Sequence, residues 1–210
     1  MNPVVDSLVE DLEPVRPLGP FLPVAMIAAL TAIIAVTVFA LLGARADLLA
    51  GEPHAIFLLR SGVLALIGAA TLGAVVSAAR PGVGTQRDGW RWALGFGAIF
   101  PVSTLILAIV DGGISTAVLT APSSRLCIGA GLVGGLALAI PLTLWLRQGA
   151  VVDADRIGWL VGFASGAFAL LAYNIACPSD TISYIGLWYT SALGMAAIAG
   201  RLIVPRFLRW

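Results

Sequence analysis

The chain has 210 residues and a formal net charge of +1, with 60% of its residues hydrophobic and only 11% charged. An average soluble domain carries about 25% charged residues, so this composition excludes an ordinary soluble domain and is typical of a protein that crosses a membrane several times. The sequence contains no phosphate-binding loop, nucleophile elbow or metalloprotease helix, so we expect neither an enzyme nor a bound cofactor.

The first 20 residues form a polar segment ahead of the apolar part of the chain. Apolar residues recur in it at helical spacing between acidic ones, which predicts a short acidic amphipathic helix. An anionic membrane surface repels such a helix, so we expect it to bind a basic protein that itself binds nucleic acid, without direct nucleic-acid binding by this chain. A merely solvated tail is the alternative. The expected partner-binding residues are Asp6, Leu8, Val9, Glu10, Asp11, Leu12 and Arg16.

Six charge-free apolar windows follow this segment. An ionised side chain at the bilayer centre costs about 2.5–3.5 kcal/mol even on a lenient scale, so the charged residues mark the window ends. The expected spans are residues 21–43, 61–79, 92–110, 126–146, 157–176 and 183–200. Pro101 and Pro141 interrupt two of them, which a membrane bundle tolerates. The predicted fold is all-α, a six-helix transmembrane domain over residues 21–204 with a short tail at 205–210.

The arginines indicate the orientation of this bundle. Short loops rich in basic residues stay in the cytoplasm, and here one side of the bundle has nine arginines and the other has three. One side has Arg16, Arg80, Arg87, Arg91, Arg147, Arg156, Arg201, Arg206 and Arg209, and the other has Arg45, Arg60 and Arg125. We therefore expect both termini in the cytoplasm and the protein in the bacterial inner membrane.

Small residues predict close helix packing in two spans. Gly158, Gly162 and Gly166 repeat every fourth residue and line one face of the fifth span, and Gly131 and Gly135 form a similar pair in the fourth. Such faces let helix backbones approach closely. We interpret them as packing surfaces within the bundle.

The two cysteines are expected at the periplasmic side. Cys127 lies at the start of the fourth span and Cys177 just after the fifth, so antiparallel helices bring both to a similar depth. A static disulfide, a pair that responds to oxidants or metals, and two unpaired buried thiols all remain open. Asp180 could lend a metal ligand or tune a thiol, but whether a metal binds is not decided by the sequence.

Several segments together resemble the NrsF-type negative regulators of an extracytoplasmic-function sigma factor, a family of six-span membrane anti-sigma factors. The resemblance rests on the tail DSLVEDLEPVRPLGP, the motif ACPSDTISYIGLWY over residues 176–189, and the ending RFLRW. It implies that the N-terminal segment holds a sigma factor at the membrane. It also implies that Cys127 and Cys177 take part in releasing that factor under oxidant or heavy-metal stress.

Two other classes remain as alternatives. A small transporter or channel needs polar or charged groups inside the bundle, and the predicted spans contain no acid, histidine or lysine. A structural subunit of a membrane complex would be indifferent to loss of the cysteines. For the regulator, the sequence identifies no element that carries a signal from the cysteines to the first span.

Overall fold

A computed structural model describes residues 19–79, 89–149 and 151–208 of the chain. Within these ranges every regular element is helical. The elements are α2 (Phe21–Leu42), α3 (Ala46–Leu49), α4 (Ala55–Ala78), α5 (Gly89–Gly97), α6 (Ile99–Val110), α7 (Thr116–Leu119), α8 (Ser123–Gly129), η1 (Ala130–Gly134), α9 (Gly135–Leu146), α10 (Ala154–Tyr173), α11 (Ile182–Tyr184), η2 (Ile185–Tyr189) and α12 (Thr190–Leu208).

The predicted number of spans is confirmed. Six continuous helical stretches in the described residues are long and apolar enough to cross a membrane: α2, α4, α5 with α6, α8 with η1 and α9, α10, and α11 with η2 and α12. The third stretch is divided at Ala98 because Pro101 has no N–H to donate to the carbonyl four residues earlier. Pro141 lies inside α9, as a membrane bundle permits.

Two predicted boundaries are wrong: the sixth span continues past residue 200 to Leu208, and the start of the second span was placed too late. The second span begins at Ala55, so Arg60 is not a loop residue but lies inside α4, where its side chain is fully buried. The spans are therefore not free of buried charge, and the argument against a transporter that used that absence no longer holds. The prediction failed because hydropathy cannot tell a solvated arginine from one whose hydrogen bonds are made inside the protein.

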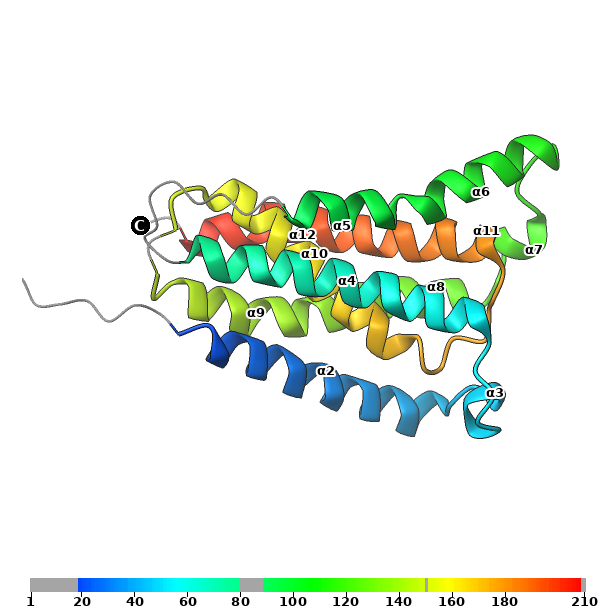
Figure 1. Cartoon of the computed structure of the whole chain (residues 1–210), viewed down its shortest axis with the longest axis horizontal. Coiled ribbons are helices and arrows are strands. Elements are labelled where there is room, and N and C mark those ends of the chain that lie inside the picture. The colour runs from blue at the N-terminus through cyan, green and yellow to red at the C-terminus, as the bar shows by residue number, and fades with distance from the viewer. Residues whose placement is uncertain (1–18, 80–88, 150, 209–210) are drawn as a thin grey trace, which may run out of the picture.

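The helices run side by side as an elongated bundle with α10 in its centre (Figure 1). α10 packs against α12, α4, α9 and α2. In its most apolar stretch of 18 residues, 72% of the residues are buried inside the protein. The corresponding fraction for α2 is 6%, so α2 lies at the edge and is the most loosely packed span. The start of α2 and the end of α12 lie at the same end of the bundle (Figure 1).

The glycine face of α10 packs within the bundle, as predicted, and its partner is α12. A Cβ built on Gly162 would lie 2.6 Å from Cα of Ala197, and one built on Gly158 would lie 2.9 Å from the Gly200 carbonyl oxygen. No side chain fits between backbones this close, so only glycine allows this approach. A Cβ built on Gly135 of α9 would lie 3.6 Å from the Cα of Gly166.

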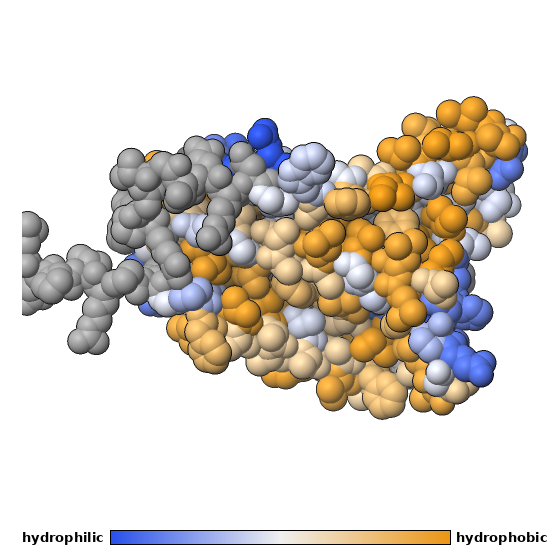
Figure 2. Space-filling model, in the orientation of Figure 1, coloured by the Kyte–Doolittle hydropathy of each residue, from blue (hydrophilic) through white to orange (hydrophobic). Residues whose placement is uncertain are grey.

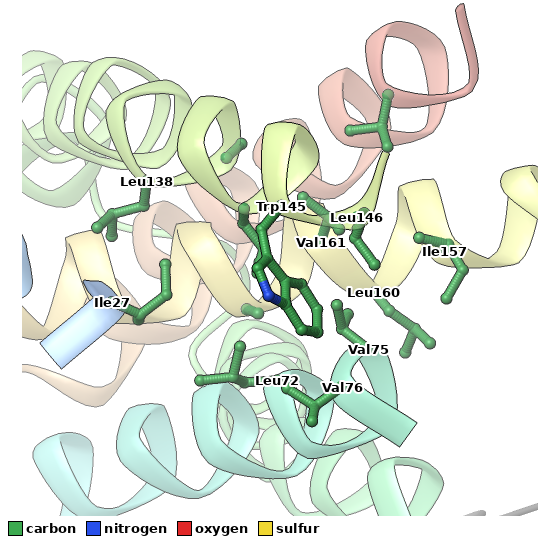
Figure 3. Packing of buried hydrophobic residues seen from close by; sticks show 14 of the residues in the cluster. Ile27, Leu72, Val75, Val76, Leu138, Trp145, Leu146, Ile157, Leu160 and Val161 are labelled. Carbon is green, nitrogen blue, oxygen red and sulfur yellow. The ribbon is translucent and has the colours of Figure 1, made fainter. Parts of the chain in front are cut away.

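Two apolar clusters fill the bundle. In the half that holds the ends of α4 and α9, the Trp145 ring lies among aliphatic side chains of neighbouring helices, including Leu72 and Val76 of α4 and Val161 of α10 (Figure 3). The other cluster occupies the opposite half and includes both cysteines. The outer surface is a broad apolar zone, with hydrophilic residues gathered toward the two ends (Figure 2). This pattern indicates a membrane protein whose apolar zone faces lipid.

Candidate functional site

Both cysteines lie at one end of the bundle, which we call the cysteine end. Cys127 is in α8 near the start of its span, and Cys177 is in the segment between α10 and α11. Both side chains are 0% exposed, belong to the same cluster and are free thiols in the structure. The predicted proximity of the two residues is therefore present. No group of three or more His, Cys, Asp or Glu side chains gathers around a point in the described part of the chain.

Arg45 forms an ion-pair cluster at this end, which we call the Arg45 clamp: Arg45, Asp47, Asp180 and the Cys177 carbonyl. The guanidinium donates to both oxygens of Asp180, at 2.7 and 2.5 Å, and to both oxygens of Asp47, at 2.9 and 3.0 Å. Its Nη1 also donates to the Cys177 carbonyl at 2.7 Å. These bonds use the full donor capacity of an arginine. The clamp fixes the Cys177 segment against the chain that follows α2.

Electrostatics within the clamp favour the charged forms. Hydrogen bonds to Asp180, and next those to Asp47, raise the pKa of the Arg45 guanidinium above its ordinary value, against the opposing effect of burial. Hydrogen bonds from Arg45 hold the pKa of the Asp47 carboxyl well below its ordinary range. The His54 backbone N–H also donates to Asp47, at 3.2 Å. Arg45 and Asp47 are therefore both ionised at neutral pH.

Arg60 is the second arginine of the cysteine end, and its surroundings differ. Its Nη1 donates to the Ser179 carbonyl at 2.9 Å and contacts Cys177 Sγ at 3.9 Å. The guanidinium carbon lies 4.7 Å from the centroid of the Tyr189 ring, a cation–π arrangement. Among the described residues, Arg60 has no carboxylate partner, and its Nε and Nη2 have no hydrogen-bond partner.

The motif over residues 176–189 supplies most of this site. Besides Cys177 and Asp180, its Tyr184 and Tyr189 are buried in the cluster around the thiols. Trp188 Nε1 donates to the Val118 carbonyl at 2.8 Å, which ties the motif to α7. The Ile182 carbonyl accepts from the Thr104 hydroxyl at 3.0 Å, which ties it to α6. The motif is therefore the segment that joins the elements of the cysteine end.

Sequence reasoning missed Arg45 and Arg60, which it counted only as loop charges. One signal was available for Arg60, because apolar residues flank it on both sides from Ala55 to Ala79. The expected partner-binding residues lie outside the described residues, so no structural statement is made about Asp6, Leu8, Val9, Glu10, Asp11, Leu12 and Arg16. Asp180, which the sequence left either as a solvated loop residue or as one that could tune a thiol or bind a metal, pairs with Arg45.

Comparison with known proteins relates almost the whole chain to one group of regulators. The family described as negative regulator of sigma F matches residues 8–210. The chain is 31% identical over 177 residues to the Anti-sigma-F factor NrsF of Caulobacter vibrioides (strain NA1000 / CB15N). That match covers 82% of this chain and 81% of the relative. No solved structure matches the chain.

Proposed function

Since this chain belongs to the NrsF family of negative regulators of sigma F, we propose that it holds an extracytoplasmic-function sigma factor at the bacterial inner membrane and releases it under thiol-reactive stress. The family is one of regulators rather than enzymes, and the partner of an anti-sigma factor is a sigma factor. The release signal in this proposal is an oxidant or a heavy metal that reacts at Cys127 and Cys177. The observation that carries it is the Arg45 clamp, which joins the Cys177 segment to α2.

The proposed orientation puts the cysteine end in the periplasm and both termini in the cytoplasm. The arginines support it, because the bundle end that holds the start of α2 also holds more basic residues. Arg147, Arg156, Arg201 and Arg206 lie toward that end. At the cysteine end, Arg45 and Arg60 are buried and only Arg125 is exposed. The periplasm is also the compartment in which oxidants reach thiols most readily.

The sigma factor is proposed to bind the N-terminal segment, residues 1–20. The apolar residues of this segment offer a helix face for a groove, and its acidic residues match the basic surface of a protein that binds DNA. Residues 14–20 contain Pro14, Pro17 and Pro20, which make a stiff link to α2. A displacement of α2 would therefore be passed to the bound segment.

The Arg45 clamp supplies the connection between the cysteines and this segment. Arg45 follows the end of α2 by three residues, and its backbone N–H donates to the Ile175 carbonyl at 3.1 Å. A reaction that moves the Cys177 segment therefore pulls directly on the chain that ends α2. Because α2 is the least buried span, its displacement disrupts little packing. We propose that this displacement weakens the hold on the sigma factor.

Co-purification from membranes tests the proposed function. The full chain is expected to bring a sigma factor with it, and the chain without residues 1–20 is expected to bring none. Leu8→Asp combined with Leu12→Asp should also lose the partner, because it puts charges on the predicted docking face. Val15→Asp combined with Leu18→Asp is the matched control, which adds the same charges to the link beyond Pro14. A sigma factor that stays bound to the Leu8 and Leu12 variant would contradict docking through this face.

A further inference from the structure

Among the described residues Arg60 is a buried cation without a carboxylate partner, and its guanidinium contacts the sulfur of Cys177, which can supply a counter-charge. The Arg60 side chain is 0% exposed and enters no ion pair in the part of the chain that the structure describes. Burying an unpaired charge is costly, so buried charges in proteins are normally paired. Within the described residues, the side-chain atom that accepts a hydrogen bond from Arg60 is Cys177 Sγ, at 3.9 Å.

The surroundings of this sulfur are suited to a negative charge. The titratable and charged side chains that face it are Arg60 of α4, Cys127 of α8, Tyr173 of α10, Tyr184 of α11 and Tyr189 of η2. None of these is a carboxylate. The buried hydroxyls of Tyr184 and Tyr189 lie beside the thiol, within hydrogen-bond reach of its sulfur. Asp180, the nearest acid along the chain, is already held by Arg45.

We propose that Cys177 is the reactive thiol of the pair, held as a thiolate by a buried ion pair with Arg60, whose cation–π contact with Tyr189 fixes the guanidinium beside it. The S–H proton leaves to water, and the hydroxyls of Tyr184 and Tyr189 donate to the sulfur. Cys127 lies in the same cluster but has no hydrogen bond to a cation, so it remains the protonated, slower thiol. Arg60 is thus a positioning residue for the chemistry of Cys177.

This inference rests on the proposed thiol sensitivity but deepens it, because it assigns different roles to the two cysteines. A thiolate reacts with an electrophile far faster than a thiol. With iodoacetamide, the sulfur forms a bond to carbon while the carbon–iodine bond breaks and iodide leaves. The rate of that step is nearly independent of pH for a sulfur that is already ionised. For a protonated thiol it rises about tenfold per pH unit, because each unit raises the thiolate fraction tenfold.

Alkylation of purified full-length protein tests the inference without a sigma factor. In the Cys127→Ser variant, the alkylation rate of Cys177 should be nearly constant between pH 6 and pH 8. At pH 6 this rate should be at least about tenfold higher than the rate of Cys127 in the Cys177→Ser variant. Adding Arg60→Gln should restore the tenfold rise per pH unit, while Arg60→Lys should keep the flat profile because it keeps a cation. Arg125→Gln is the matched control, since it removes an exposed arginine from the same end.

Three outcomes would overturn the ion pair. They are equal rates for the two cysteines at pH 6, a steep pH profile with Arg60 intact, or a flat profile that survives Arg60→Gln. If Arg60→Gln does not fold, two measurements still test the ion pair. They are the pH profile of the Arg60→Lys variant and the comparison of the two single-cysteine variants with Arg60 intact. Sigma-factor release takes no part in these measurements. A protein with the expected alkylation rates that never releases a sigma factor would therefore refute the proposed function and leave this inference standing.

Discussion

Gly162→Ala is expected to destabilise the bundle at the contact between α10 and α12. The Cβ of an alanine there would lie 2.6 Å from the Ala197 Cα and 3.0 Å from the Ala197 carbonyl oxygen. Ordinary contacts of a Cβ begin near 3.4 Å, so the two helix backbones would have to separate by roughly 1 Å. Because both contacts are with backbone atoms, no side-chain rotation relieves them.

The loss of unfolding free energy caused by this separation can be estimated from the known cost of overpacking. Overpacking a well-packed site costs typically about 1–3 kcal/mol, and here the longest helix contact of the bundle is affected. Gly194→Ala in α12 is the matched control, because nothing lies within 4 Å of a Cβ at Gly194. That variant should be as stable as the parent or slightly more stable, since alanine favours a helix by about 1 kcal/mol over glycine.

Unfolding in mixed micelles, with SDS as the titrant and tryptophan fluorescence as the signal, measures both variants. Gly162→Ala should unfold at lower SDS than the parent by an amount equivalent to about 1–3 kcal/mol, and Gly194→Ala should not. If Gly162→Ala were as stable as Gly194→Ala, the close approach of α10 and α12 would be refuted.

Three further predictions concern the cysteine end. Arg45→Gln should leave the sigma factor bound but prevent its release by a thiol oxidant, because the Cys177 segment is no longer held to α2; co-purification before and after oxidation checks this. The pKa of Asp47 is lowered by Arg45, so its contribution to stability is complete above the ordinary aspartate value of about 4 and is lost as the pH falls below it. Thermal unfolding between pH 6 and pH 3 should therefore show a steeper loss of stability for the parent than for Asp47→Asn. Trp188→Phe should lower the unfolding free energy by about 1 kcal/mol, through loss of the hydrogen bond to the Val118 carbonyl, and SDS titration measures it.

The spans and the glycine face could be predicted from the sequence because both depend on local patterns. An apolar window of sufficient length spans a bilayer wherever it lies, and three glycines at a spacing of four share a helix face in any fold. The partners of that face were not predictable, since nothing in residues 158–166 identifies Ala197 or Gly200. Those contacts depend on the order in which the helices pack.

The two buried arginines could not be placed from the sequence for the same reason. Arg60 is held by a carbonyl 119 positions away, and Arg45 by a carboxylate 135 positions away. An arginine near a window end is usually solvated, so hydropathy places both in loops. The motif over residues 176–189 could be recognised as unusual, but only the fold explains it, because Asp180 completes one arginine site and Ser179 and Tyr189 surround the other.

Release of the sigma factor on thiol modification is the most direct test of the central claim. Membrane vesicles that carry the protein with its bound sigma factor are treated with the thiol oxidant diamide or with Cd²⁺, and the factor is measured in the supernatant after sedimentation. The account predicts release from the parent protein and retention by the variant with both Cys127→Ser and Cys177→Ser. Retention by the parent after its thiols have reacted, or equal release from the variant without cysteines, would contradict it.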